Sequence, residues 1–198
     1  MGNERLTITA NARSLGVVLD DNMLFDVHVS DMCRSSLNQL RNLSKITKYL
    51  TQESRDIAVH VFITSKLVYC NSFLYDCRKV QLKKLQYCQN TAARIVTQTR
   101  KFDDITPVLF DLHWLPVSYR IVFKILLLVF KSLNNLSPSY LADRLSYQSH
   151  SRVLRSASKQ LLDQPRSITK TYGDKAFSMC APKPVSYTHL TLPTSDLV

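Results

Sequence analysis

Apolar residues recur every three or four positions along much of this chain, a spacing that predicts amphipathic helices. The first helix is expected from about Val27 to Tyr49. Its apolar positions are Val29, Met32, Cys33, Leu37, Leu40 and Leu43. A second helix is expected to begin after Thr51, an N-cap type of residue, and to run to about Leu74. A third is expected over about residues 79–98.

Other patterns flank these three helices. The alternation in residues 6–9 and the β-branched run of residues 14–19 predict a strand pair within residues 5–20. Pro107 and Pro116 mark two further helix starts, because proline is tolerated in the first helical turn. The helix after Pro116 is the most apolar of the chain and is expected to end near residues 134–135. Ser137-Pro138 predicts another short helix.

Residues 146–170 are polar and basic without a sustained period, which predicts a loop or mobile arm. A short ordered element is expected over residues 172–181. Only three of the 198 residues are glycine, which argues against a turn-rich β-sandwich, and the hydrophobic content of 45% argues against wholesale disorder. The patterns together predict a mainly α fold with a small N-terminal β remnant, large enough for one domain or two small ones.

The net charge of +11 is unevenly distributed. Residues 1–31 carry a net −3, residues 41–101 a net +9, and residues 144–183 a net +6. Blocks of lysine and arginine are typical of chains that bind nucleic acid, because these side chains displace condensed counterions from phosphates. A soluble basic surface without a specific partner is the alternative.

The basic side chains fall into rows on two predicted helices. At 100° per residue, one face of the third helix carries Lys79, Lys83, Arg94 and Lys101, if that helix extends to Lys101. The long apolar helix carries a second row, made of Arg120, Lys124 and Lys131. Such rows can follow a sugar-phosphate backbone without reading its sequence, whereas the simpler interpretation is a solvated helix face.

Signals for catalysis are weak. The paired acids Asp20-Asp21 and Asp103-Asp104 are interpreted as a strand exit and an exposed loop rather than as magnesium ligands. The five histidines are scattered, and His113-Trp114 is interpreted as a pair at the edge of the core. The five cysteines form no CxxC pair, so we expect buried, reduced thiols and no zinc site.

No membrane segment is expected. The apolar run of residues 121–130 is short, contains Lys124 and is followed by Lys131, so it is not expected to span a bilayer. Residues 1–20 contain no apolar core of a signal peptide.

Several separated segments of the chain resemble one family. The segments are residues 14–20 with Phe25 and His28, then 50–54, 65–72, 85–94, 104–145 and 172–178. They resemble the part that follows the catalytic hairpin in reverse transcriptases of non-LTR (LINE-type) retrotransposons, and the likeness covers roughly residues 12–183. One departure is Asn135, which stands where relatives often have glycine.

The resemblance implies the organisation of the chain. Residues 1–26 correspond to the end of the palm, with Leu15 and Gly16 in a primer-grip-like position. Residues 27–101 correspond to a helical thumb-like bundle, 102–145 to a post-thumb helical region, and 146–183 to a basic arm with a short ordered element. The fingers, most of the palm and the catalytic aspartate pair are missing, so no catalytic residue is expected.

The resemblance also implies a function and partners. The parent activity is RNA-directed DNA synthesis with Mg²⁺, and this part is expected to grip template and primer without making bonds and without a cofactor of its own. Its implied partners are RNA or DNA backbones and the missing palm and fingers, in the cytoplasm or nucleus. The alternatives are a helical protein-interaction module and a relic reading frame without a selected function.

The last segment follows a different pattern. Residues 184–198 read PVSYTHLTLPTSDLV, which resembles a translated cloning adapter, whereas the family continues with an apolar segment. A non-native tail is not selected to pack, so disorder is expected there. A genuine strand over residues 185–192 is the alternative.

Overall fold

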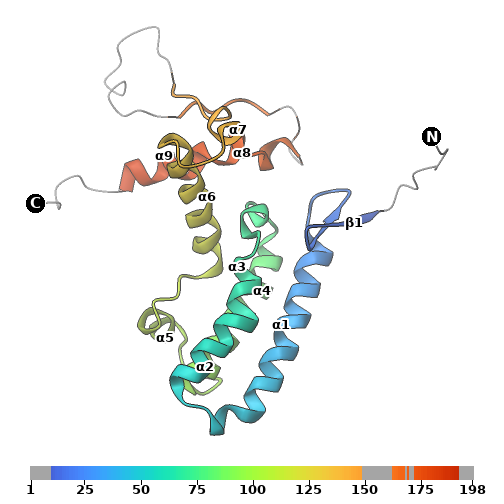
Figure 1. Cartoon of the computed structure of the whole chain (residues 1–198), viewed down its shortest axis with the longest axis vertical. Coiled ribbons are helices and arrows are strands. Elements are labelled where there is room, and N and C mark those ends of the chain that lie inside the picture. Colours follow the sequence, from blue (N-terminus) through green and yellow to red (C-terminus); the bar gives the residue numbers. More distant parts are fainter. Residues whose placement is uncertain (1–9, 149–161, 168, 170–171, 192–198) are drawn as a thin grey trace, which may run out of the picture. The chain divides into compact units, whose positions relative to one another are not determined.

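The computed structural model describes residues 10–148, 162–167, 169 and 172–191. The mainly α prediction is confirmed, since 64% of the structure is helical and the sheet has two strands near the N-terminus (Figure 1). The chain divides into two compact units, Met1–Ser118 and Tyr119–Val198.

A β-hairpin opens the described part of the chain. Strands β1 (Asn11–Ser14) and β2 (Val17–Asp20) pair antiparallel, with Ser14 opposite Val17. Leu15 (φ 46°) and Gly16 (φ 83°) form the two-residue turn, and positive φ at both positions is typical of type I′ hairpins. The turn therefore divides the run that the sequence predicted as one strand, and residues 6–9 lie outside the described residues.

Helix α1 (Asp26–Ile46) extends from the hairpin and is followed by the 3₁₀ turn η1 (Thr47–Tyr49). Its buried positions are Val29, Met32, Cys33, Ser36, Leu40 and Leu43. This is the predicted face with one exchange, because Ser36 is buried in place of Leu37.

The second predicted helix is segmented. It consists of α2 (Gln52–Val59), the π-helical turn η2 (His60–Thr64), α3 (Ser65–Val68) and, after Cys70, the 3₁₀ turn η3 (Asn71–Leu74). Thr51 caps α2 as predicted, because its Oγ1 accepts a hydrogen bond from the Ser54 N–H at 3.2 Å. Cys70 has a φ of 51°, which interrupts the helical path.

Helix α4 (Lys79–Thr97) packs along α1 in the same direction. An ion pair of 2.9 Å joins Arg78 to Asp26 where the two helices begin, and Cys88 lies against Cys33 further along. The core of this unit is filled by large side chains from α1, α2, η2 and α4. They include Phe25, Val29, Leu40, Val59, Ile63, Leu85 and Val96.

Helix α5 (Thr106–Asp111) ends in a left-handed turn at His113, whose φ is 54°. The Trp114 N–H donates to the Leu109 carbonyl at 2.8 Å, the bond expected of a Schellman motif. His113 is exposed, and Trp114 is buried with its ring edge-on to His60, 5.6 Å away. The prediction is therefore confirmed for Trp114, which lies in the core, and wrong for His113, which stands exposed in the left-handed turn.

Helix α6 (Val117–Leu133) follows and also ends as predicted. Asn135 has a φ of 56°, and the Leu136 N–H donates to the Lys131 carbonyl at 2.8 Å. Asparagine is one of the few residues that adopt this conformation readily, so the left-handed turn forms here without a glycine.

Shorter elements complete the second unit. They are α7 (Ser139–Ala142), η5 (Gly173–Lys175), α8 (Phe177–Cys180) and α9 (Pro182–Thr191), and one bridge joins Tyr147 to Leu162. Most of the predicted basic arm lies outside the described residues. The predicted tail begins at 184, yet the backbone of residues 184–191 is helical in α9, while residues 192–198 lie outside the described residues.

Candidate nucleic-acid interface

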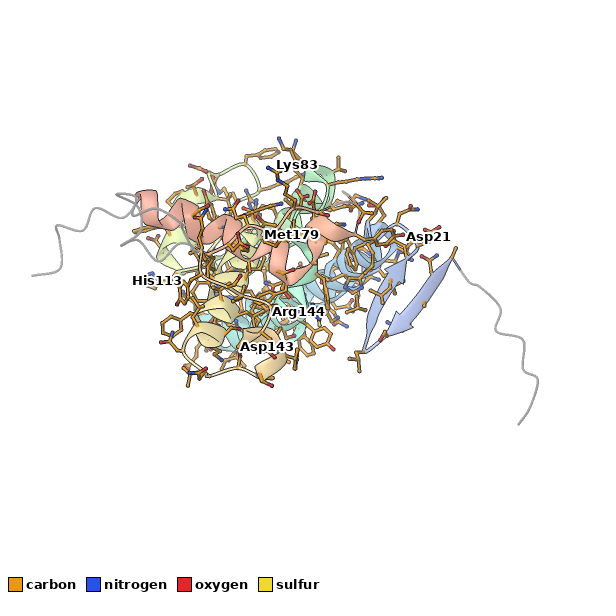
Figure 2. The ribbon with its side chains drawn as sticks, turned by 90° about the horizontal axis from the view of Figure 1, so that it is seen from above. Asp21, Lys83, His113, Asp143, Arg144 and Met179 are labelled. Atoms are coloured by element: carbon orange, nitrogen blue, oxygen red, sulfur yellow. The ribbon has the colours of Figure 1, made fainter. Side chains whose placement is uncertain are left out.

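The exposed face of α4 carries lysines near its beginning. Lys79 and Lys83 lie one helical turn apart and are exposed, and Lys84 is exposed beside them. Figure 2 labels Lys83. The opposite face is buried through Gln81, Leu85, Cys88, Gln89, Ala92, Ala93 and Val96. The first half of the predicted row is therefore present on a solvent-facing helix surface.

The second half of that row differs from the prediction. Gln98 adopts a left-handed conformation (φ 57°) and ends α4, so Lys101 stands in the following turn instead of on the helix. Arg94 bends over the same turn, where its Nε donates to the Arg100 carbonyl at 3.3 Å and its Nη2 to the Asp103 carbonyl at 3.2 Å. Arg94 therefore stabilises a loop, and the row of four reduces to Lys79 and Lys83.

Arg55 belongs to the basic block of residues 41–101, but its side chain does not lie on the surface. It is buried, and its guanidinium donates to the Val96 carbonyl at 3.0 Å and to the Leu50 carbonyl at 2.7 Å. These bonds join the beginning of α2 to the end of α4. One sequence signal marked it, because Arg55 lies four residues before the buried Val59 and so falls on the apolar face of its helix.

The predicted basic row on α6 is only partly exposed to solvent. Val117, Ile121, Ile125 and Val129 form a buried stripe at four-residue spacing. Arg120 and Lys124 are half-buried, and burial lowers the pKa of the Arg120 guanidinium. Lys131, in the last turn, is exposed. Only the end of this row therefore presents a charge fully to solvent.

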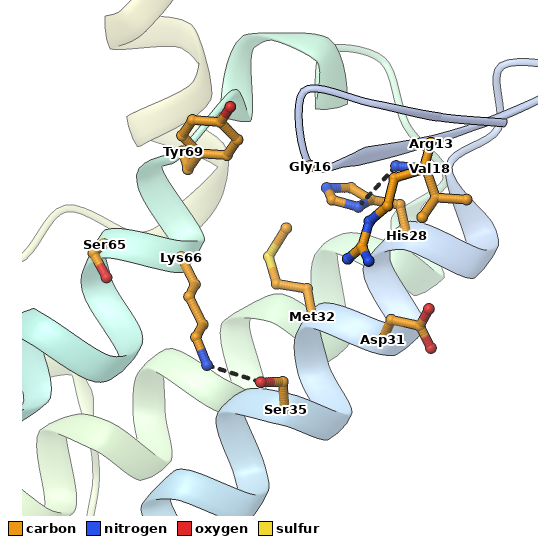
Figure 3. A pocket seen from close by; sticks show the side chains of 10 residues that line it. All are labelled: Arg13, Gly16, Val18, His28, Asp31, Met32, Ser35, Ser65, Lys66 and Tyr69. Atoms are coloured by element: carbon orange, nitrogen blue, oxygen red, sulfur yellow. Dashed lines mark hydrogen bonds between the residues drawn. The ribbon is translucent and has the colours of Figure 1, made fainter.

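A pocket with a mixed apolar and polar lining lies between the hairpin, α1 and α3, with a volume of about 550 Å³ (Figure 3). Its charged and polar lining residues are Arg13, His28, Asp31, Ser35, Ser65, Lys66 and Tyr69. These residues come from three stretches of sequence that no local motif connects. Sequence reasoning therefore missed Arg13, Lys66 and Tyr69 as site residues.

Hydrogen bonds hold the walls of this hairpin pocket. The Tyr69 hydroxyl donates to the Leu15 carbonyl at 2.6 Å, and the Lys66 ammonium donates to the Ser35 hydroxyl at 2.8 Å. The predicted primer-grip-like residues, Leu15 and Gly16, thus form the turn that closes one side of the pocket. Gly16 is selected by its φ of 83° rather than by crowding, since an added Cβ would meet Tyr69 at an ordinary 3.8 Å.

His28 is held in its neutral form. Burial lowers its pKa, and Arg13 contributes in the same direction, while Asp31 opposes the shift. The Val18 N–H donates to His28 Nδ1 at 3.4 Å, which requires that nitrogen to be unprotonated. His28 therefore supports β2 and adds no positive charge to the pocket at neutral pH.

Acids of both pairs accept hydrogen bonds from backbone N–H groups. Asp20 accepts hydrogen bonds from the N–H groups of Leu24 (2.9 Å) and Phe25 (2.8 Å), which turns the chain into α1. Asp104 accepts from the Thr106 N–H at 3.0 Å, and this bond lowers the pKa of its carboxyl. Within the described ranges, no three histidine, cysteine or acidic side chains gather as metal ligands.

Among the helices that the structure describes, none is both long and apolar enough to cross a membrane. No family model, curated protein or solved structure matches this chain. Two features of the unit Met1–Ser118 could contact a partner, namely the exposed lysines of α4 and the hairpin pocket.

Proposed function

We propose that this chain is a non-catalytic nucleic-acid-binding module, corresponding to the template–primer grip of an RNA-directed DNA polymerase of the non-LTR retrotransposon type. The hairpin pocket is the observation that carries the proposal. It brings Arg13 and Lys66 into one cavity beside the Leu15-Gly16 turn, although 52 residues separate the two cations in the sequence.

The pocket has the chemistry of a phosphate site. The guanidinium of Arg13 and the ammonium of Lys66 can each donate to a phosphate oxygen, and the Ser35 and Ser65 hydroxyls line the same cavity. Asp31 reduces the positive charge at one wall. The half-exposed ring of Tyr69 offers a surface on which a base or sugar can stack.

Lys79 and Lys83 supply the second contact. Both face solvent, and lysines that neutralise phosphates bind independently of base sequence. Binding is then expected to be weak, non-specific and strongly reduced by salt. The proposal assigns no bond-making step and no cofactor to this chain, although the parent family uses Mg²⁺.

The test is the salt dependence of binding to a labelled RNA–DNA primer–template, measured by fluorescence anisotropy. In the double variant Lys79→Gln/Lys83→Gln, the log–log salt slope is expected to flatten by about two units, at about 0.9 per phosphate contact. Arg13→Gln/Lys66→Gln is expected to do the same. The matched control is Arg41→Gln/Lys45→Gln, which removes two exposed charges from the other end of α1.

Each outcome has a consequence. If the control flattens the slope as much as the site variants, binding follows net charge and the interface assignment is wrong. If no variant changes slope or affinity, both surfaces are ordinary solvated faces. Primer extension by the purified chain with Mg²⁺, primed RNA and nucleotides would contradict the non-catalytic part of the proposal.

The second candidate function is a protein-interaction module. Several large apolar side chains of the unit Met1–Ser118 face solvent, including Leu15 (87% exposed), Phe102 (93%) and Phe110 (79%). Exposed apolar side chains that gather into one patch are typical of contacts with another protein, and in this candidate the partner is the palm and fingers of the parent polymerase. If the unaltered chain binds no primer–template in the test above, this candidate is favoured.

A further inference from the structure

Two cysteines meet where α1 and α4 pack together. Cys33 and Cys88 are both free thiols, and the Cys88 Sγ lies 4.0 Å from the Cys33 carbonyl oxygen. Cys88 is fully buried, while Cys33 retains 7% of its exposure. The two residues are 55 positions apart in the sequence, so only the packing of the two helices brings them together.

Cys33 is reached from a cavity of its own. This cavity has a volume of about 620 Å³, is distinct from the hairpin pocket, and lies between α1 and α4. Its charged lining residues are Arg34, Lys83 and Lys84, and its apolar lining includes Val80 and Tyr87. Arg34 also faces Asp31 at 3.6 Å, so the two lysines carry most of the unpaired positive charge.

The surroundings favour the thiolate of Cys33. A hydrogen bond with Cys88 lowers the pKa of the Cys33 thiol, burial opposes that change, and the charge of Lys84 lowers the pKa further. Cys33 lines the cavity, whereas Cys88 is fully buried and does not, so Cys33 is the member of the pair that an incoming disulfide can reach, and its thiolate is the attacking form. The same contact and burial raise the pKa of Cys88.

We propose that Cys33 is a modification site for small anionic disulfides such as glutathione disulfide, and that Cys88 resolves the adduct into an intrachain Cys33–Cys88 disulfide. The cavity admits the reagent, and Lys83 and Lys84 attract its carboxylates. No nucleic acid takes part in this chemistry, so the test of this inference is independent of the test of the proposed function.

The reaction has two exchanges. First, the Cys33 thiolate attacks one sulfur of glutathione disulfide, forming a mixed disulfide and releasing one glutathione thiolate. Second, Cys88 loses its proton to water and attacks the Cys33 sulfur, releasing the second glutathione. The two protein thiols lose two electrons and two protons, and one glutathione disulfide is reduced to two glutathione molecules.

The test uses the full reduced chain, glutathione disulfide and intact-mass analysis, with peptide mapping after the remaining thiols are alkylated. The wild type is expected to lose two hydrogens with Cys33 and Cys88 linked. Cys88→Ser is expected to stop at the glutathione adduct on Cys33, and Cys33→Ser is expected to form neither product. Cys180→Ser is the matched control and is expected to behave as the wild type.

A second measurement tests the role of the charged lining. Lys83→Gln/Lys84→Gln is expected to slow the reaction with glutathione disulfide several-fold more than the reaction with uncharged hydroxyethyl disulfide, because loss of the Lys84 charge raises the pKa of Cys33 for both reagents and loss of the anion attraction affects only the first. Equal slowing with both reagents would overturn the anionic preference. Mapping of the wild type decides the site without any variant, because adducts confined to Cys70 or Cys77, or no oxidation, would overturn the proposal.

Discussion

The two long helices α4 and α6 both carry basic residues at helical spacing, yet they place them in opposite environments. Lys79 and Lys83 stand on the exposed face of α4, whereas Arg120 and Lys124 are half-buried on α6. The buried stripe of α6 is aliphatic, while the buried face of α4 includes the amides of Gln81 and Gln89. Two similar rows of basic residues in the sequence therefore differ in how much positive charge they expose to solvent.

The comparison separates basic residues that can bind a partner from those that hold the fold. Around α4, Arg55 and Arg94 donate to backbone carbonyls, and Lys79 and Lys83 face solvent. Buried or capping cations cannot contact phosphate without leaving carbonyls unpaired. The count of positive charges in residues 41–101 therefore overstates the surface that can bind nucleic acid.

The largest expected effect is the loss of the buried arginine that holds the end of α4. Arg55→Ala leaves the carbonyls of Val96 and Leu50 without this donor, so we expect the free energy of unfolding to fall by about 2–4 kcal/mol. Urea unfolding followed by circular dichroism measures it. Arg41→Ala, an exposed arginine of α1, is the control and should change stability by less than about 0.5 kcal/mol. Equal losses in both variants would show that Arg55 is not structural.

The next effect tests the buried amides that distinguish α4 from α6. Gln89 Nε2 donates to the Leu115 carbonyl at 2.8 Å, and Gln86 Oε1 accepts from the Val117 N–H at 2.9 Å, where α6 begins. Gln89→Leu leaves a carbonyl unpaired, so we expect a loss of about 1–3 kcal/mol in the same urea experiment. Gln39→Leu makes the same change at an exposed site of α1. A Gln89→Leu variant as stable as this control would contradict the anchoring role.

A smaller effect compares the ends of the two helices. Gln98 after α4 and Asn135 after α6 both have left-handed backbones, which glutamine tolerates less well than asparagine. Gln98→Gly is therefore expected to stabilise the chain by about 0.5–1 kcal/mol, and Asn135→Gly by less. Thermal melts of the two variants provide the comparison. A larger gain at Asn135 would reverse the assigned order of strain.

The smallest expected effect concerns His28, the half-buried histidine that lines the hairpin pocket. The pKa of His28 in the folded chain lies below 6.5, its ordinary value. As the pH falls through 6.5, the histidine takes up a proton in the unfolded chain before it does so in the folded chain. The free energy of unfolding is therefore largest above pH 6.5 and decreases as the pH falls toward the lowered pKa of the folded chain. Melts at about pH 7.5 and about pH 5.5 should show a smaller decrease for His28→Asn than for the wild type. His113→Asn, at an exposed position, is the control and should keep the full decrease.

Much of the secondary structure was predictable because its causes are local. Helical spacing located α1 and α4, Thr51 marked the cap of α2, and Pro107 and Pro116 marked the starts of α5 and α6. The hairpin turn was misplaced because a β-branched run conceals the positive φ of Leu15. The end of α4 was expected at about residue 98, where the helix does end, but the row of four cations required the helix to continue to Lys101, and glutamine carries no turn signal that would have excluded this.

The availability of charge was decided only by tertiary structure. A row of cations follows from helical spacing, but whether each one reaches solvent depends on carbonyls contributed by distant segments, as Val96 is for Arg55. The hairpin pocket and the Cys33–Cys88 contact likewise join residues more than fifty positions apart. Periodicity describes one element at a time, so it determined which residues share a face, and packing between elements determined which of them remain available to bind or react.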